Sequence, residues 1–327
     1  METYTTPRLI LDSPVPECGK TTVLEHLSRL CMDPVQMATV SSPAMITRLL
    51  NQRPRTILID EVDRALDPKM DKTGELLAVL NSGYKRGATR PVLVQNGKDW
   101  DPVEMPTFSP AAMAGNGPQL PDDTRSRSIR VLLMPGGDDV EESDWEMIEG
   151  EAETLGKRLA DWADQVRDAV RENRPPLHHT VKNRARERWS PLNRVAAQAG
   201  GRWPAVVETL AIRDVERVKL ELEEGIVQQR PSVVIVTHIH AVWAKNPTES
   251  FIPTETLVKD LIHADPFMWG LESTYGKNLT AQRLGRMLVS SFNIRSCRPN
   301  HHGDPRGYTR QSFDSAFRRM GIFKNAA

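Results

Sequence analysis

Short apolar runs alternate with segments of helical periodicity in the amino-terminal part of the chain. The run RLIL at 8–11 has the length of a buried strand, and TTVLEHLSRLC after it repeats apolar residues at helical spacing. The run TILIDEVD at 56–63 is typical of a buried parallel strand that ends in acids. Alternating strands and helices predict an α/β fold with a parallel sheet flanked by helices. The remaining segments are a helix at GELLAVLNSGYKRG and strands at PVLVQ, FSPAAMAGN and SIRVLLM.

The pattern changes after residue 137, and it suggests three domains. The acidic stretch GGDDVEESDWEMIEGE is typical of a linker, and amphipathic helical patterns follow it to about residue 224, with Pro and Gly between short helices. We interpret this region as a helical lid. The predicted domains are a core at 1–137, an acidic linker and lid at 138–225, and a carboxyl-terminal module at 226–327.

The carboxyl-terminal module begins with an ambiguous segment, PSVVIVTHIHAVW. Its β-branched residues favour a strand, whereas the spacing of its apolar residues favours a helix, and we predict a helix. TETLVKDLI and LTAQRLGRMLVSSF each begin with a Thr suited to N-capping. A polar, hairpin-like stretch at 293–313 and a last helix follow. This order resembles a winged helix-turn-helix.

Composition narrows the class of protein. The formal net charge is zero, but nine carboxylates lie within 138–153, and the segment 276–327 has ten basic and two acidic residues. A basic carboxyl-terminal end suits a nucleic-acid partner. No apolar run reaches membrane-spanning length, and three scattered cysteines suit neither a disulfide framework nor a metal site. The start METYTTPRLILD lacks a targeting pattern, so we expect a cytoplasmic location, in the host cytoplasm if the protein is phage-encoded.

The loop SPVPECGKTT joins the first strand to the first helix and carries the end of a phosphate-binding pattern. Backbone N–H groups at a helix start face phosphates, Lys20 reaches the β and γ oxygens, and the Thr21 hydroxyl binds Mg²⁺. Pro14 replaces the usual first Gly of this pattern, and a chance Gly-Lys-Thr turn is the alternative. The residues expected to hold ATP are Glu17, Cys18, Gly19, Lys20, Thr21 and Thr22.

Acids at the end of the TILIDEVD strand make the ATP-site interpretation much stronger. Asp60 can hold Mg²⁺, together with Thr21, and Glu61 can polarise the attacking water, with a strand end capped by solvated acids as the disfavoured alternative. Asn116 ends a later strand and suits a residue that orients this water, with a turn Asn as the alternative. Arg127 suits an arginine finger better than Arg125 does, and a surface or DNA contact is the alternative for both. The predicted catalytic residues are therefore Asp60, Glu61, Asn116 and Arg127.

Several segments together are similar to one family over nearly the whole chain. These are SPVPECGKTTVLEHL, ILIDEVD, LNSGYKRGA, AGNGPQLPDDTRSRSI, RWSPLNRVAAQAGGRWP and RGYTRQSFDSAFRRM. They resemble the domain-of-unknown-function P-loop ATPase family of phages, prophages and integrative elements, which is of AAA+ type and often lies beside or fused to primases. The resemblance implies an AAA+ sheet with a helical lid and a role in mobile-element DNA replication. Its members tolerate an SPxxxxGKT loop with a Cys at the place of Cys18.

Candidate nucleic-acid contacts lie in two places. Tyr84, Lys85, Arg86 and Arg90 in LNSGYKRGATR suit base stacking and phosphate binding, and a solvated helix end is an equal alternative. Arg194 and Arg202 in the lid are candidates for contact with the γ-phosphate. For each of them, an arginine on the helix surface is the favoured interpretation. The carboxyl-terminal candidates are Gln282, Arg283, Arg286, Arg295, Arg298, His301, His302 and Arg306.

The expected function is an ATP-hydrolysing motor or remodeller on DNA, similar to a helicase or helicase loader, with ATP and Mg²⁺ as cofactors. Expected partners are DNA, further copies of the chain in a ring and a primase or other replication proteins, with no membrane. One alternative is an ATP-switched DNA-binding initiator or regulator without motor activity. The other is a scaffold with a degenerate nucleotide site.

Overall fold

A computed structural model describes residues 2–38, 42–66, 73–118, 120–136, 143–224, 230–299 and 303–322. Contacts divide the chain into two compact units, Met1–Val218 and Lys219–Ala327. We describe each unit by itself. The predicted boundaries near residues 137 and 225 stay a prediction. Among the described residues, no helix combines the length and apolar character that crossing a lipid bilayer requires.

The first unit is built around a five-stranded parallel sheet in the order β2-β3-β6-β1-β7. Each pair of neighbouring strands runs in parallel, which confirms the predicted α/β class with a parallel sheet. The strands are β1 (Arg8–Ser13), β2 (Pro34–Met37), β3 (Thr56–Ile59), β6 (Ala111–Asn116) and β7 (Ser128–Leu132).

Helices cover both faces of this sheet because successive strand residues point to opposite sides. Ile57, Ile59 and Met113 pack in one core with α2, α3 and α4, whereas Leu58 and Ala112 pack in another with α1. Strands buried on both faces explain the continuous apolar runs in the sequence. These helices are α1 (Lys20–Leu30), α2 (Pro43–Gln52), α3 (Val62–Ala65) and α4 (Thr73–Ser82), and the short α5 (Asp122–Arg125) precedes β7.

A buried arginine holds the amino-terminal end of β1. Arg8 is 1% exposed, and its Nε donates to the Leu80 carbonyl at 2.9 Å while Nη1 contacts the Ser109 carbonyl. Burial lowers the pKa of Arg8 to about 9. Because Leu80 lies in α4 and Ser109 lies just before β6, one guanidinium ties three segments together.

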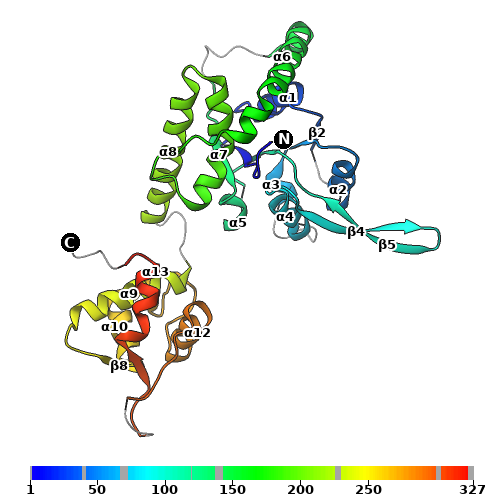
Figure 1. Cartoon of the computed structure of the whole chain (residues 1–327). Coiled ribbons are helices and arrows are strands. Elements are labelled where there is room, and N and C mark those ends of the chain that lie inside the picture. Colours follow the sequence, from blue (N-terminus) through cyan, green and yellow to red (C-terminus); the bar gives the residue numbers. More distant parts are fainter. Residues whose placement is uncertain are drawn as a thin grey trace. The chain divides into compact units, whose positions relative to one another are not determined.

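The strand predicted at 91–95 exists, but placing it in the parallel sheet is wrong. β4 (Thr89–Asn96) pairs with β5 (Asp99–Pro106) in a separate antiparallel hairpin that extends from the core (Figure 1). The register leaves only Gly97 and Lys98 between the strands, and a two-residue connection favours a tight hairpin. Most of its side chains are exposed, so the hairpin is not a central strand.

Long helices form the second half of the first unit, namely α6 (Trp145–Glu172), α7 (Asn183–Ala199) and most of α8 (Trp203–Glu223). The prediction of short helices separated by Pro and Gly is wrong at Pro191, which lies buried inside α7. The linker interpretation is wrong from Asp144 onward. The Asp144 carboxylate accepts from the Glu146 N–H, and both acids favour the positive end of the helix dipole. Residues 137–142 lie outside the described part.

A buried ion pair joins α7 to α8. Arg188 and Asp214 each have a side chain only 7% exposed and approach to 2.5 Å, and Trp189 Nε1 donates to the same carboxylate at 2.9 Å. Burial alone would raise the pKa of Asp214, but the hydrogen bond from Trp189 and the pairing with Arg188 outweigh it and leave this pKa lowered. Arg188 also donates to the Ser126 carbonyl at 2.6 Å, so the pair connects these helices to the turn before β7.

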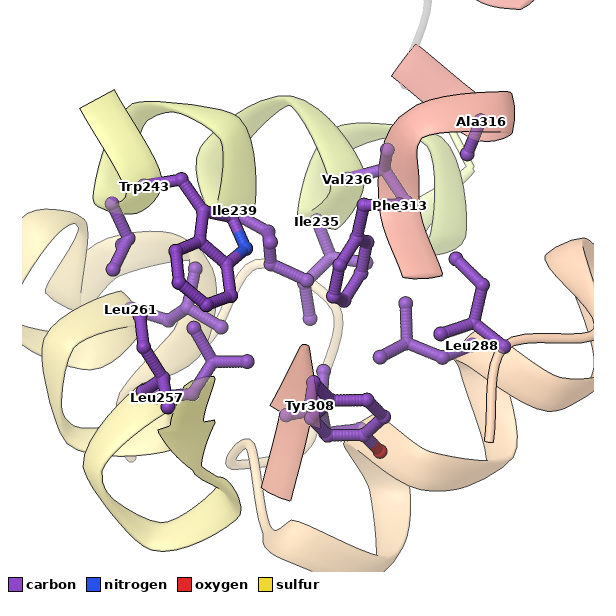
Figure 2. Packing of buried hydrophobic residues seen from close by; sticks show 14 of the residues in the cluster. Ile235, Val236, Ile239, Trp243, Leu257, Leu261, Leu288, Tyr308, Phe313 and Ala316 are labelled. Atoms are coloured by element: carbon purple, nitrogen blue, oxygen red, sulfur yellow. The ribbon is translucent and has the colours of Figure 1, made fainter. Parts of the chain in front are cut away.

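The second unit packs its helices and two short strands around one apolar core (Figure 2). The ambiguous segment forms α9, which confirms the predicted helix, because Ile235, Ile239 and Trp243 all reach this core. Packing thereby overrides the strand preference of its β-branched residues. The elements are α9 (Pro231–Lys245), β8 (Phe251–Pro253), α10 (Thr254–Ala264), α11 (Pro266–Trp269), α12 (Ala281–Phe292), β9 (Gly307–Thr309), the 3-10 helix η1 (Arg310–Phe313) and α13 (Asp314–Arg319).

Only one of the two predicted threonine caps is confirmed. Thr280 caps α12, since its hydroxyl accepts from the Arg283 N–H at 3.1 Å. Thr254 is instead the first residue of α10, where Pro253 occupies the N-cap position. β8 pairs antiparallel with β9, and Cys297 bridges to Gly307 on the same small sheet.

Asp214→Asn should destabilise the first unit by about 3 kcal/mol at pH 7, since it leaves Arg188 buried without a charged partner. The pKa of Asp214 is lowered in the folded state, so its stabilisation is fully present above the unfolded value of 3.8 and is lost as pH falls through the lower pKa of the folded state. Thermal unfolding should therefore separate the variant from wild type at pH 7, and the difference should shrink as pH falls below 3.8. Asp164→Asn, which breaks an exposed pair with Arg167, is the control. Equal melting at pH 7 for wild type and Asp214→Asn would contradict this account.

Candidate nucleotide site

The loop between β1 and α1 leads the chain from the edge of the sheet into a helix start. Gly19 is the N-cap residue with φ 77° and ψ 14°, a left-handed conformation that favours glycine. The first N–H groups of a helix have no partner within the helix, so those of α1 are available to an anion. Glu17 is exposed and also has a positive φ of 61°. Cys18 is buried, with Sγ 3.2 Å from the Val15 carbonyl, so its thiol supports the loop from inside.

Lys20 is held at the junction of two neighbouring strands. Its Nζ donates to Ser13 Oγ at 2.5 Å and to Asn116 Oδ1 at 2.7 Å. Ser13 and Asn116 end β1 and β6 and lie opposite each other in the parallel register. The strand pairing therefore brings Asn116, 96 residues further along the chain, to the ammonium group of Lys20.

Thr21 contacts the acid strand. Its Oγ1 donates to Asp60 Oδ2 at 3.0 Å, and Asp60 Oδ1 accepts from the N–H of Glu61 at 2.9 Å. Thr22 follows in α1 and is half-buried. A hydroxyl and a carboxylate this close supply the oxygen ligands that Mg²⁺ prefers. Glu61 has φ 50°, is exposed, and pairs with Arg64 at 2.8 Å.

Several polar residues around this cluster were not predicted from the sequence. Ser13 accepts from Lys20, and Asp12 is buried at 3% exposure and paired with Arg130. Asp12 directly follows the apolar run RLIL, and this position could have indicated a buried carboxylate that requires a partner. Ser13 and Arg64 are ordinary loop and helix residues by sequence.

Arg127 lies in the turn between α5 and β7. Its Nη1 donates to the Asp123 carbonyl at 2.5 Å, and its side chain is 22% exposed. Arg125 is more exposed and pairs with Asp122 at 2.5 Å. Both arginines are therefore held by acids of α5.

The prediction that Tyr84 stacks on bases is wrong. Tyr84 is fully buried, and burial raises its pKa to about 12. Lys85 and Arg86 remain more accessible, with Lys85 Nζ 3.9 Å from Glu187. Arg90 pairs with Glu75 at 2.9 Å. The turn after α4 is thus anchored by its aromatic residue and presents only its cations.

Arg194 is not placed for a phosphate contact. It is 8% exposed, Nε donates to the Asn173 carbonyl at 3.0 Å, and Nη2 contacts the Arg171 carbonyl. These contacts tie α7 to the end of α6, so both the phosphate-contact and the favoured surface interpretation are wrong for Arg194. Arg202 is exposed and lies 5.3 Å from the Trp203 ring centroid.

In the second unit, α12 has one buried and one polar face. Leu284 and Leu288 are buried in the core, whereas Gln282 and Arg286 are exposed one turn apart. Arg283 turns back toward the Lys277 carbonyl. His301 and His302 lie outside the described residues. The remaining predicted contacts are exposed after the helix, at Arg295, Arg298 and Arg306.

The fold and the cluster together define an α/β protein with polar residues gathered at the carboxyl ends of parallel strands, where such sheets bind ligands. Residues 136–320 match the family described as "Protein of unknown function (DUF3631)". The match covers more than half of the chain, so the chain belongs to this family. The match begins after β7, and Lys20, Asp60 and Asn116 lie outside it.

Two other comparisons concern individual proteins. The chain is 29% identical over 168 residues to the "Uncharacterized 28.9 kDa protein in xis 5'region" of Saccharopolyspora erythraea, covering 50% of this chain and 59% of that relative. Two structures of the NrS-1 C terminal region share 12% and 13% identity with it, each with a TM-score of 0.43 over 94% of this chain and 67% of theirs.

Proposed function

We propose that this protein binds ATP with Mg²⁺ at the carboxyl edge of the sheet and hydrolyses it. The observation that carries the proposal is the convergence of Lys20, Thr21, Asp60 and Asn116 through hydrogen bonds of 2.7 Å and 3.0 Å, with Glu61 next in the chain. These groups come from the ends of three adjacent strands and from the helix start after one of them. Lysine, hydroxyl, acid pair and polar amide are the functional groups that phosphoryl transfer to water requires.

Binding follows from charge and geometry. The first turn of α1 offers N–H donors and the positive end of a helix dipole, and Lys20 adds a full positive charge beside them. Thr21 Oγ1 and Asp60 would hold Mg²⁺, which neutralises phosphate charge when bound. Ser13 and Asn116 hold the Lys20 ammonium in position until phosphate oxygens replace them as acceptors.

Hydrolysis needs a base and a group that orients water. Glu61 suits the base because it follows the Mg²⁺-binding Asp60 directly and its exposed ion pair with Arg64 is weak enough to open. Asn116 lies between the lysine and the acids, because β6 is the strand between β1 and β3. Its carboxamide can therefore orient a water molecule that Glu61 activates.

The proposed substrate of the motor is DNA. The proposed DNA-binding surface consists of the exposed cations on α12 and after it, Arg286, Arg295, Arg298 and Arg306. The order α9, β8, α10, α11, α12, the Cys297 bridge and β9 suits a winged helix-turn-helix. The relative from Saccharopolyspora erythraea is named for its place in a xis 5′ region, which suits a mobile-element setting. The resulting function is an AAA+ type helicase or helicase-loader activity in phage or mobile-element replication. Stimulation of ATP turnover by single- or double-stranded DNA tests it, and slow, unstimulated turnover favours the ATP-switched initiator instead.

Lys20→Ala should weaken ATP binding by at least about a hundredfold, since each hydrogen bond to a charged group contributes about 1.5–3 kcal/mol. Glu61→Gln should bind ATP normally and turn it over roughly a hundredfold or more slowly, because the amide keeps the shape and loses the base. Equilibrium binding of a fluorescent ATP analogue and steady-state phosphate release measure the two effects. Lys157→Ala on the exposed surface of α6 is the control. Wild-type ATP affinity in Lys20→Ala would refute the nucleotide site.

Replacing Arg286 and Arg298 by Ala in the full chain should weaken duplex DNA binding and leave basal ATPase unchanged. Each phosphate contact that is lost should lower the slope of log affinity against log salt by about 0.9. The control replaces Lys245 and Lys259, two exposed cations of the same unit, so both double variants lose equal charge. Equal affinity losses and salt slopes in the two variants would show that net charge alone, and not this surface, binds DNA.

Arg127→Ala should bind ATP yet turn it over roughly a thousandfold more slowly, as expected for an arginine finger acting on a neighbouring subunit. Mixing it with Glu61→Gln subunits should restore part of the activity, because a mixed ring contains sites with both residues intact. Phosphate release measured against the mixing ratio tests the rescue. The mass of the assembly, measured in the presence of a non-hydrolysable ATP analogue, tests ring formation. Arg125→Ala is the matched control. A fully active monomer, or normal turnover in Arg127→Ala, would refute the ring.

A further inference from the structure

The turn that follows β6 is held by two carboxylates from different parts of the chain. The N–H of Asn116 donates to Asp63 Oδ1 at 3.3 Å, and the next N–H, that of Gly117, donates to Asp12 Oδ1 at 2.9 Å. Asp63 lies in α3 directly after the acid pair, and Asp12 lies in β1 directly before the phosphate-binding loop. Two successive backbone donors are thus fixed by the two segments on either side of β6.

The Asp12 carboxylate is held in a fixed position. It is buried, and its second oxygen accepts from Arg130 Nε at 2.7 Å on β7. Its own carbonyl accepts from the Leu133 N–H at 2.7 Å. A carboxylate held by both a guanidinium and a backbone donor keeps a fixed position, so Gly117 is fixed relative to β1 and β7.

Asp63 reaches the turn because residue 115 is glycine. A Cβ at Gly115 would lie 2.7 Å from Asp63 Oδ1 and 2.9 Å from Val62 Cγ1, which is closer than real Cβ atoms approach. The absence of a side chain there lets α3 approach the end of β6. Since α3 begins right after Glu61, this contact couples the position of Asn116 to that of the acid pair.

We propose that Asp63, together with Asp12, is a positioning residue for the Asn116 carboxamide, and this rests on the proposed function of the same site. Neither carboxylate contacts Lys20, Thr21 or Asp60 through a hydrogen bond that the structure records for the described residues. Asp63 acts through the backbone of Asn116. It fixes where the side-chain oxygen of Asn116 lies relative to Lys20. It therefore also fixes how Asn116 orients the water molecule that Glu61 activates.

Loss of the Asp63 contact should affect the chemical step of ATP hydrolysis more than ATP binding. Loosening the turn moves a group that orients water, whereas ATP is held chiefly by the helix start and by Lys20. Small misplacements of a positioning group lower the rate far more than the affinity. Asp63→Ala should therefore lower kcat by roughly ten- to a hundredfold and leave KM within about twofold.

The test compares Asp63→Ala with Asp63→Asn, which keeps an oxygen acceptor for the Asn116 N–H. We expect Asp63→Asn to retain most of the wild-type kcat, and Glu75→Ala, which breaks an exposed pair with Arg90, to be indistinguishable from wild type. Amide hydrogen exchange, read by NMR without nucleotide, should show faster exchange at Asn116 in Asp63→Ala than in Asp63→Asn.

Four results are decisive. Unchanged kcat in Asp63→Ala, or an equal loss in Asp63→Asn, overturns the positioning role, as does unchanged exchange at Asn116. A wild-type protein without ATPase activity overturns the proposed function instead. In that case the exchange measurement still decides whether Asp63 holds the turn.

Discussion

The parallel ladder between β1 and β6 runs from Arg8 opposite Ala111 to Ser13 opposite Asn116, and it fixes the distances within the polar cluster. Since parallel strands end at the same edge, the end of β6 has to lie beside the loop that leads into α1. β3 pairs with the other side of β6, which brings Asp60 to the same edge. Buried Arg8 holds the opposite end of β1 to α4 and to the segment before β6, so the ladder is anchored at both ends.

Carboxylates have three different physical tasks in the first unit. Asp60, close to a hydroxyl donor and near the surface, suits a cation. Asp12 and Asp214 are buried beside arginines, and these pairs connect strands or helices. Asp63 and Asp144 accept backbone N–H groups and fix a turn or a helix start. The local environment, and not the residue type, separates these tasks.

Local pattern was sufficient for much of this architecture. The strands at residues 8, 56, 111 and 128 and the helix at 231–245 follow from apolar periodicity, and the approach of Lys20 to Asn116 follows once the sheet is parallel. Burial of individual polar side chains was not predictable, because it depends on partners far away in sequence. Tyr84 lies next to exposed cations by sequence yet is covered by tertiary packing. Arg194 satisfies carbonyls at the end of a preceding helix, which no helical periodicity specifies. The β4–β5 hairpin was missed because one of its strands contains two prolines and much charge.

The polar groups around Lys20 are hydrogen-bonded to one another: ammonium to hydroxyl and amide, and Thr21 hydroxyl to Asp60. Under the proposed function, a bound phosphate would replace these bonds with new ones, and only the difference between the two sets would contribute to affinity. When the phosphate leaves, these groups would pair with one another again. A site with this internal balance is suited to repeated cycles of loading and emptying more than to permanent retention of what it binds.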